Sequence, residues 1–302
     1  MGATSAPNFA ETLVQLVIRA RRIDELLRTN EDWQMLGHIA SRMLFWCGGA
    51  IYGCRCDGNE MRFALQVTYA PLGAMAHHIS GGYAIHLRRT RGLDGSIFKH
   101  YTAIPLHDEI FLDDLVLWLH RSEPNRRIWT GDDAYLSPNS LPWINTERVL
   151  SALSVGAPGP ATYRRRKRDA ISPQLVERFM QRPQRGARAD LGNASAAETH
   201  GPNHEARARP EIESIARLVA NFCGVSFDEM LAESRKRSVS KARVIATVLA
   251  TRHGATVASA ARLFHRSRST LIEQAEHYRA TQPELFVEAD ALLAAFLDER
   301  RA

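Results

Sequence analysis

The sequence predicts an α+β N-terminal domain that is followed by a small all-helical domain. Two observations support this fold class: short strand patterns alternate with helix patterns over about the first 155 residues, and only helix patterns occur after residue 211. The chain has 302 residues, of which 45% are hydrophobic, so two domains of ordinary size can each bury a core. We therefore expect domains over 10–155 and 211–302, joined by the segment 156–210.

The N-terminal elements follow one another as strand, helix, two strands, helix, strand and helix. The Asp57-Gly58-Asn59 turn sequence between the second and third strands makes these two strands a hairpin. This order predicts an antiparallel sheet with helices packed on it. The apolar patterns predict strands over 12–18, 50–56 and 61–67, an extended segment over 96–106, and helices over 22–46, 71–91 and 107–121.

The positive charge of the chain is concentrated in the segment 156–210. This segment alone has a net charge of +6, which equals the net charge of the whole chain, and it contains the run Arg164-Arg165-Arg166-Lys167-Arg168. Beyond residue 183 the segment lacks an apolar period, so we expect a basic and partly flexible linker. The five basic residues are candidates for contact with a nucleic-acid backbone, and the alternative is a solvated helix face.

The C-terminal segment has the pattern of a helix-turn-helix. Helical spacing predicts a long helix over about 239–252, then a short helix that Thr256 caps and a further helix that Ser267 caps. Upstream, Ser226 and Glu229 have capping-box spacing for another short helix. Two helices separated by a tight turn are typical of DNA-binding proteins, in which the start of the second helix reaches base edges. The residues at that position are Arg266, Ser267, Arg268, Ser269 and Thr270.

Four strings in this segment carry a family resemblance: Phe222-Cys223-Gly224-Val225-Ser226, Ser234-Arg235-Lys236-Arg237, Ala242-Arg243 and Ala261-Arg262-Leu263-Phe264. Through them residues 212–278 resemble the DNA-binding domain IV of the bacterial replication initiator DnaA. The resemblance implies that a basic segment and the helix after it contact DNA phosphates. The residues concerned would be Arg235, Lys236, Arg237, Lys241 and Arg243.

The base-reading positions depart from that family. The family reads bases with an Asp-His-Thr-Thr signature, and the matching residues here are Ser267-Arg268-Ser269-Thr270, so the initiator's own binding site is not expected. Arg268 can instead pair bidentately with a guanine. The sequence has no Gly-rich loop ending in Gly-Lys-Ser or Gly-Lys-Thr, so the ATPase of the initiator is not expected either.

A second resemblance concerns the N-terminal domain. The strings Tyr83-Ala84-Ile85-His86-Leu87-Arg88-Arg89, Gly95-Ser96-Ile97-Phe98, Asp113-Asp114-Leu115-Val116-Leu117 and Ala134-Tyr135-Leu136 occur in this order. They resemble the tyrosine transposases associated with repetitive extragenic palindromes, some of which also carry a DnaA-like C-terminal domain. The resemblance implies the ferredoxin-like antiparallel sheet of HUH nucleases over residues 10–155.

The catalytic residues of that family are not present at the matching positions. The family uses a His-hydrophobic-His pair that holds a divalent metal and a tyrosine that attacks the phosphate. The pair is replaced here by Glu60 and Arg62, and the tyrosine by Trp118 or Leu119. Arginine cannot bind a metal ion, and neither Trp nor Leu is a nucleophile. We therefore expect no catalytic residue, no metal site and no cofactor.

The sequence thus predicts a domesticated, catalytically inactive transposase-like protein that binds double-stranded DNA sequence-specifically and regulates transcription. One alternative is an active metal-dependent transposase or nuclease for single-stranded DNA. Another is a protein–protein adaptor that uses the apolar stripe over 283–301, although we expect this stripe to dock on its own domain. DNA hairpins and a homodimer stay open as further partners.

The sequence also predicts where the protein acts. No apolar run reaches the roughly 20 residues of a membrane span, so no membrane contact is expected. The four cysteines without an export signal favour the cytoplasm, where a DNA-binding protein would associate with the nucleoid.

Overall fold

The computed structural model describes residues 12–67, 72–106, 112–123, 126–137, 139–154, 159–169, 171–180 and 212–299. The chain forms two compact units. Unit 1 contains the described residues up to Met180 apart from Phe45–Cys47, which group with unit 2, the residues from Ile212 onward. No helix in the described ranges is long and apolar enough to cross a membrane.

Unit 1 is built on a five-stranded antiparallel sheet with the strand order β4-β1-β3-β2-β5. Six consecutive residues are buried in each of β1, β2 and β3. Such continuous burial requires cover on both faces of the sheet. The strands are β1 (Thr12–Arg19), β2 (Ala50–Asp57), β3 (Glu60–Val67), β4 (Thr102–Leu106) and β5 (Ile128–Thr130).

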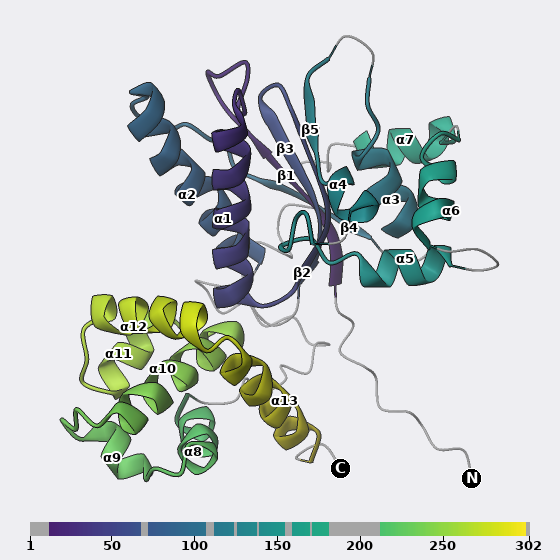
Figure 1. Ribbon diagram of the computed structural model, residues 1–302. Coiled ribbons are helices and arrows are strands. Elements are labelled where there is room, and N and C mark those ends of the chain that lie inside the picture. Colours follow the sequence, from purple (N-terminus) through teal and green to yellow (C-terminus); the bar gives the residue numbers. More distant parts are fainter. Residues whose placement is uncertain are drawn as a thin grey trace, which may run out of the picture. The chain divides into compact units, whose positions relative to one another are not determined.

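Helices provide that cover on both sides (Figure 1): α1 and α2 lie on one side of the sheet, and α3, α5 and α6 lie on the other. The unit is therefore an α+β sandwich with the central strands in its core. Its helices are α1 (Asn30–Cys47), α2 (Leu72–Arg91), α3 (Leu112–Leu119), α4 (Asp132–Leu136), α5 (Glu147–Leu153), α6 (Gly159–Arg166) and α7 (Pro173–Met180).

The predicted strands and hairpin are confirmed. Asp57 pairs with Glu60, so the turn consists of Gly58 and Asn59, and Gly58 has the positive φ of 55° that favours glycine in such a turn. The extended segment 96–106 contains a shorter strand than expected, β4, and its earlier part contributes a single bridge from Phe98 to Ala20. Of the helix expected over 107–121, the structure shows α3, and residues 107–111 lie outside the described residues.

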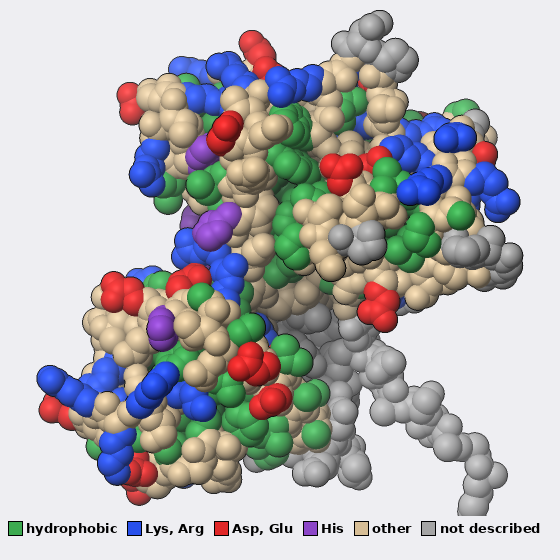
Figure 2. All heavy atoms as spheres, viewed as in Figure 1, with side chains coloured by type: hydrophobic (Ala, Val, Ile, Leu, Met, Phe, Trp, Pro, Cys, Tyr) green, Lys and Arg blue, Asp and Glu red, His purple; other side chains and the backbone are tan. Residues whose placement is uncertain are grey.

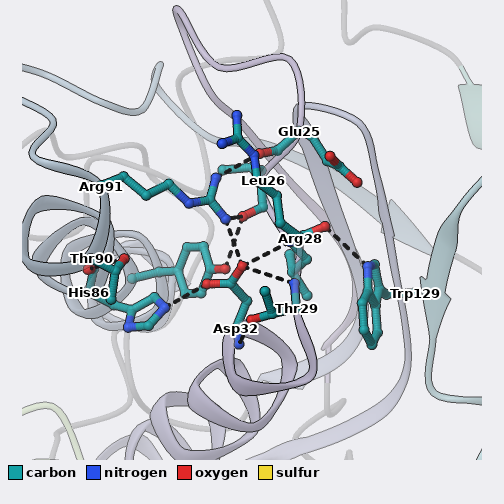
Figure 3. Close-up of polar contacts among 11 residues, drawn as sticks. Glu25, Leu26, Arg28, Thr29, Asp32, His86, Thr90, Arg91 and Trp129 are labelled. Atoms are coloured by element: carbon teal, nitrogen blue, oxygen red, sulfur yellow. Dashed lines mark hydrogen bonds and ion pairs between the residues drawn. The ribbon is translucent and has the colours of Figure 1, made fainter.

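The helix expected to begin at residue 22 begins at Asn30 instead. Thr29 accepts a hydrogen bond from the Asp32 backbone, and the Asp32 carboxylate accepts one in return from the Thr29 backbone (3.2 Å each), which is a capping box. Asp32 also accepts from the Arg28 backbone (2.8 Å) and pairs with His86 and Arg91 of α2 (2.7 Å each; Figure 3). Burial raises the pKa of the Asp32 carboxyl, but these hydrogen bonds and the Arg91 charge together lower it below its usual value.

The segment before α1 is buried without being helical. Leu26 and Leu27 are 0% and 2% exposed, which explains their apolar character. Arg91 donates to the carbonyl of Leu26 (2.7 Å), and Trp129 Nε1 donates to the carbonyl of Leu27 (3.2 Å; Figure 3). The apolar spacing thus indicated burial correctly, but tertiary hydrogen bonds take the place of a helical ladder.

The expected linker over 156–210 is wrong for its first part. Residues 159–166 and 173–180 form α6 and α7, and both helices belong to unit 1. Tyr163 and Phe179 anchor them, with 0% and 1% of their surfaces exposed. Two buried aromatic side chains make these helices part of the core, whereas a linker would leave them in water. Residues 181–211 lie outside the described residues.

Unit 2 is all-helical. The short helices begin at the predicted caps, because Ser226 and Thr256 each form a capping box with the residue three positions later. The apolar stripe of α13 docks on its own unit as expected, because α13 packs on α8 and α10, and Phe286, Ala289 and Leu293 are buried. The helices are α8 (Ile212–Phe222), α9 (Phe227–Leu231), α10 (Arg237–Arg252), α11 (Val257–Leu263), α12 (Arg268–Thr281) and α13 (Glu284–Glu299).

Candidate nucleic-acid interface

The central helix of unit 2 is α10, on which the other five helices pack. Every residue from Ala242 to Ala250 is buried, which is unusual for one helix and follows from its enclosure on all sides. The exposed part of α10 is therefore its first turn, at Arg237 and Ser238. This turn carries part of the predicted basic segment into solvent.

The turn between α11 and α12 is tight. Phe264 is buried, His265 has a φ of 51° in the left-handed region, and Ser267 then caps α12 by accepting from the Thr270 backbone (3.1 Å). A left-handed residue other than glycine is uncommon, so packing of Phe264 has to hold this turn in place. The arrangement is the helix-turn-helix that the sequence predicts, with α12 as its second helix.

The first turn of α12 presents the predicted base-reading residues. Arg268 and Ser269 are exposed, while Thr270 is half-buried. The hydroxyl of Ser267 lies 2.9 Å from that of Ser269 and 2.8 Å from that of Thr270, so it is occupied in the cap. Among the described residues, Arg268 has no ion-pair or hydrogen-bond partner, and its guanidinium is available for a guanine edge.

The basic loop, which we define as residues 234–237, lies between α9 and α10 and ends at the first residue of α10. Arg235, Lys236 and Arg237 are all exposed. Lys236 pairs with Glu229 (2.9 Å), but both side chains are well exposed, so this ion pair contributes little and can yield to a phosphate. Figure 2 shows Lys and Arg side chains gathered over this end of unit 2, near α9 and the loop that follows it.

Arg243 does not have the phosphate-contacting role that the resemblance implied. It is 3% exposed, and its guanidinium donates to the backbone carbonyls of Met230 (2.7 Å), Ser234 (2.8 Å), Glu229 (3.0 Å) and Ala232 (2.5 Å). These carbonyls belong to α9, to the residue that follows it and to the start of the basic loop, where the helical ladder has ended. Arg243 therefore shapes the loop from beneath.

A second arginine holds the same loop. Arg266, in the turn before α12, donates to the carbonyl of Ser234 (3.2 Å) and is half-buried. Ser240 of α10 also donates to Gln274 of α12 (2.9 Å). These contacts place the basic loop and the first turn of α12 beside each other, so residues about 30 positions apart form one surface.

Lys241 lies on the α8 side of α10. It is half-buried and close to Cys223, whose thiol pKa is raised by burial and lowered to a smaller extent by the Lys241 charge.

The family comparison agrees with this geometry. Residues 212–277 match the family model of the bacterial DnaA protein helix-turn-helix. The chain therefore carries a DnaA-type helix-turn-helix domain, and such a domain indicates DNA binding. The match covers about a fifth of the chain and none of unit 1. The comparisons with curated proteins and with solved structures find no match.

In unit 1 the structure brings together Glu60, Arg62 and Trp118, which the sequence resemblance placed at the positions of catalytic groups. Arg62 is 5% exposed, pairs with Glu60, and lies 5.2 Å from the centre of the Trp118 ring. Glu60 also pairs with Arg19. Leu119 is fully buried, whereas Trp118 is half-buried and has Arg62 over its ring.

Phe179 completes this cluster and was missed by the sequence analysis. Its ring lies 5.6 Å from that of Trp118, and its carbonyl accepts a hydrogen bond from Arg62 (3.0 Å). The helical spacing of Leu175, Val176 and Phe179 could have indicated the helix that carries it. An arginine and two aromatic rings thus pack together beside β3.

The basic run on α6 is divided by its contacts. Arg166 pairs with Asp113 (2.5 Å) and Asp114 (2.8 Å) of α3, and Lys167 pairs with Asp132 of α4. These two residues hold α6 on unit 1. Arg164, Arg165 and Arg168 are exposed, so they are the members of the run that can contact an anion.

Proposed function

We propose that this protein is a sequence-specific, DNA-binding transcriptional regulator. The observation that carries the proposal is the DnaA-type helix-turn-helix, in which an unpaired Arg268 and an exposed basic loop share one surface. The first turn of α12 would enter the major groove, where Arg268 would contact a guanine. Arg235, Lys236 and Arg237 would contact the phosphates beside it, and the protein would associate with the nucleoid.

Unit 1, in this proposal, derives from a transposase of the HUH type and has lost its activity. The strand order β4-β1-β3-β2, with α1 and α2 in the two crossovers, is the order expected of a ferredoxin-like sheet and supports this origin. The inactivity is supported by the Arg62, Trp118 and Phe179 cluster. A buried guanidinium would repel a divalent cation, and an indole ring has no nucleophilic oxygen.

The test is genome-wide DNA occupancy of the full chain. We compare the wild type with the triple variant R235A/K236A/R237A and with the single variant Arg268→Ala. A matched control, R22A/R28A/R89A, removes the same charge from exposed positions of unit 1. We expect discrete promoter peaks that are lost in the triple variant and kept in the control. We expect Arg268→Ala to relax the sequence preference beneath the peaks, because its contact to a guanine contributes about 1–3 kcal/mol of base discrimination.

Other outcomes would support the alternatives. Peaks confined to palindromic repeats, together with DNA linked covalently to the protein, would indicate an active transposase. The absence of peaks would favour an adaptor and contradict the proposal. A homodimer would give half-sites one helical turn apart, about 34–36 Å between their centres.

A further inference from the structure

Unit 1 contains a cavity that the DNA-binding proposal does not use. It has a volume of about 820 Å³ and lies between β2, the end of α3, α4, α6 and α7. Pockets for small ligands generally have volumes of about 300–1,000 Å³. The cavity is thus large enough for a nucleotide, and its walls are formed by one unit.

The lining of this cavity is strongly cationic. Five basic residues line it, with a single acidic residue, Glu123, among the described residues of the wall. Arg55 is neutralised, because it pairs with Glu123 (2.7 Å) and Asp57 (3.3 Å), and Lys167 is neutralised by Asp132. The three other basic residues are Arg121, Arg164 and Arg168.

Within the described residues, these three arginines have no acidic partner. Arg121 donates to a backbone carbonyl, that of Asp169, which carries no charge. Arg164 and Arg168 are exposed and have no acidic partner within the described part of the chain. They are four residues apart in and just after α6, so they share one face, and like charges at this spacing repel each other unless an anion lies between them.

The cavity also has apolar lining residues. They are Trp118, Leu136 and Val176, and Trp118 is half-buried, with Arg62 and Phe179 packed on its ring. A ligand that suits this mixed lining carries both a phosphate and a flat or apolar group. Figure 2 shows Lys and Arg side chains gathered over this side of unit 1, near α6 and α7.

We propose that this cavity is a binding site for a small phosphorylated ligand of nucleotide size. Arg164 and Arg168 bind its phosphate from α6, Arg121 adds a third charge from the end of α3, and Trp118 packs on its base or other flat part. The paired Arg166 and Lys167 hold α6 on unit 1, and this keeps Arg164 and Arg168 in the lining of the cavity. A DNA-binding protein with such a site can respond to a metabolite.

The test uses titration calorimetry on the full chain with two probes, ADP and inorganic pyrophosphate, and with adenosine as the uncharged comparison. The side chains that R164A/R168A removes are exposed, so we expect this variant to fold, and a thermal melt checks that it does. Its matched control, R89A/R165A, removes the same charge from exposed positions outside the cavity. We expect saturable binding of ADP, tighter than that of pyrophosphate, and none of adenosine.

The double variant R164A/R168A is expected to weaken ADP binding by at least about tenfold, because it removes two charged hydrogen-bonding groups, while the control stays within about twofold. Equal weakening in the control would assign the binding to general charge and overturn the proposal. So would the absence of saturable binding to the wild type. If the wild type binds a ten-nucleotide single strand but not ADP, the cavity binds nucleic acid and the small-ligand proposal is wrong. None of these results depends on the helix-turn-helix.

Discussion

At the scale of single residues, the exposed and the buried arginines of unit 2 have different roles. Arg235 and Arg268 are exposed, whereas Arg243 is buried and donates to four backbone carbonyls. Burial lowers the pKa of Arg243, and the nearby charge of Arg266 lowers it further, but four carbonyl acceptors hold the charged form in place. Sequence similarity alone could not separate these roles, since Arg235 and Arg243 lie in one basic stretch.

The contrast predicts opposite outcomes for two alanine substitutions. Arg243→Ala removes a donor from four carbonyls, of which Ser234 keeps Arg266, and is expected to lower the free energy of unfolding of unit 2 by at least about 2 kcal/mol. Arg235→Ala is expected to leave stability unchanged and to weaken DNA binding, with the salt slope reduced by about 1. Urea unfolding and DNA titrations at several salt concentrations measure both. A stable Arg243→Ala protein with weakened DNA binding would contradict the assignment.

At the scale of elements, the helices α6 and α7 show that the basic run 164–168 lies in unit 1 and not in a linker. They complete unit 1 through Tyr163, which hydrogen-bonds His120 (2.7 Å) and Asp132 (2.6 Å), and through Phe179, which packs on Trp118. Tyr163 also stacks on Tyr135 at 4.6 Å. The helices thus satisfy polar groups that would otherwise be buried without partners.

This role predicts where the chain can be truncated. A chain that ends at Met180 is expected to unfold cooperatively, whereas one that ends at Ser154 lacks Tyr163 and Phe179 and is expected to lose most of its stability. Each buried aromatic ring is worth about 3–5 kcal/mol, against a typical total of about 5–15 kcal/mol. Urea unfolding followed by tryptophan fluorescence compares the two chains, with Phe179→Ala in the full chain as the smaller change. Equal stability of both truncated chains would show that α6 and α7 are dispensable.

At the scale of the whole molecule, each unit buries a histidine that has to stay neutral. Burial lowers the pKa of His120 in unit 1 to about 3 and that of His253 in unit 2 to about 4. In the unfolded chain both would titrate near 6.5. Between these values the unfolded chain binds protons that the folded chain does not, so stability is complete above about pH 6.5 and falls as the pH drops.

The expected loss at pH 5 is about 2 kcal/mol for unit 1 from His120 alone. Urea unfolding of the full chain at pH 7 and pH 5, followed by tryptophan fluorescence, measures it. The variant His120→Gln is the control, because a glutamine carries no titratable group and is expected to reduce the difference between the two pH values. A wild type that is equally stable at both pH values would contradict the burial of a neutral His120.

Local chemistry in the sequence determined much of this protein. Capping residues such as Ser226, Thr256 and Ser267, the Gly58 turn and the apolar periods locate helices and strands, because their hydrogen bonds and spacing involve near neighbours. The DnaA-type helix-turn-helix is visible for the same reason. The apolar spacing also predicted a helix start at residue 22 that is wrong. The helix begins at Asn30, after the capping box at Thr29.

The tertiary structure alone decided which charged residues are free. Whether an arginine is buried under a loop like Arg243, paired like Arg166 or exposed beside a cavity like Arg164 depends on residues far away in the chain. The sequence shows the same guanidinium in each case. Solvent access and the position of distant acceptors set the energy of a charge, and both exist only after the chain has folded.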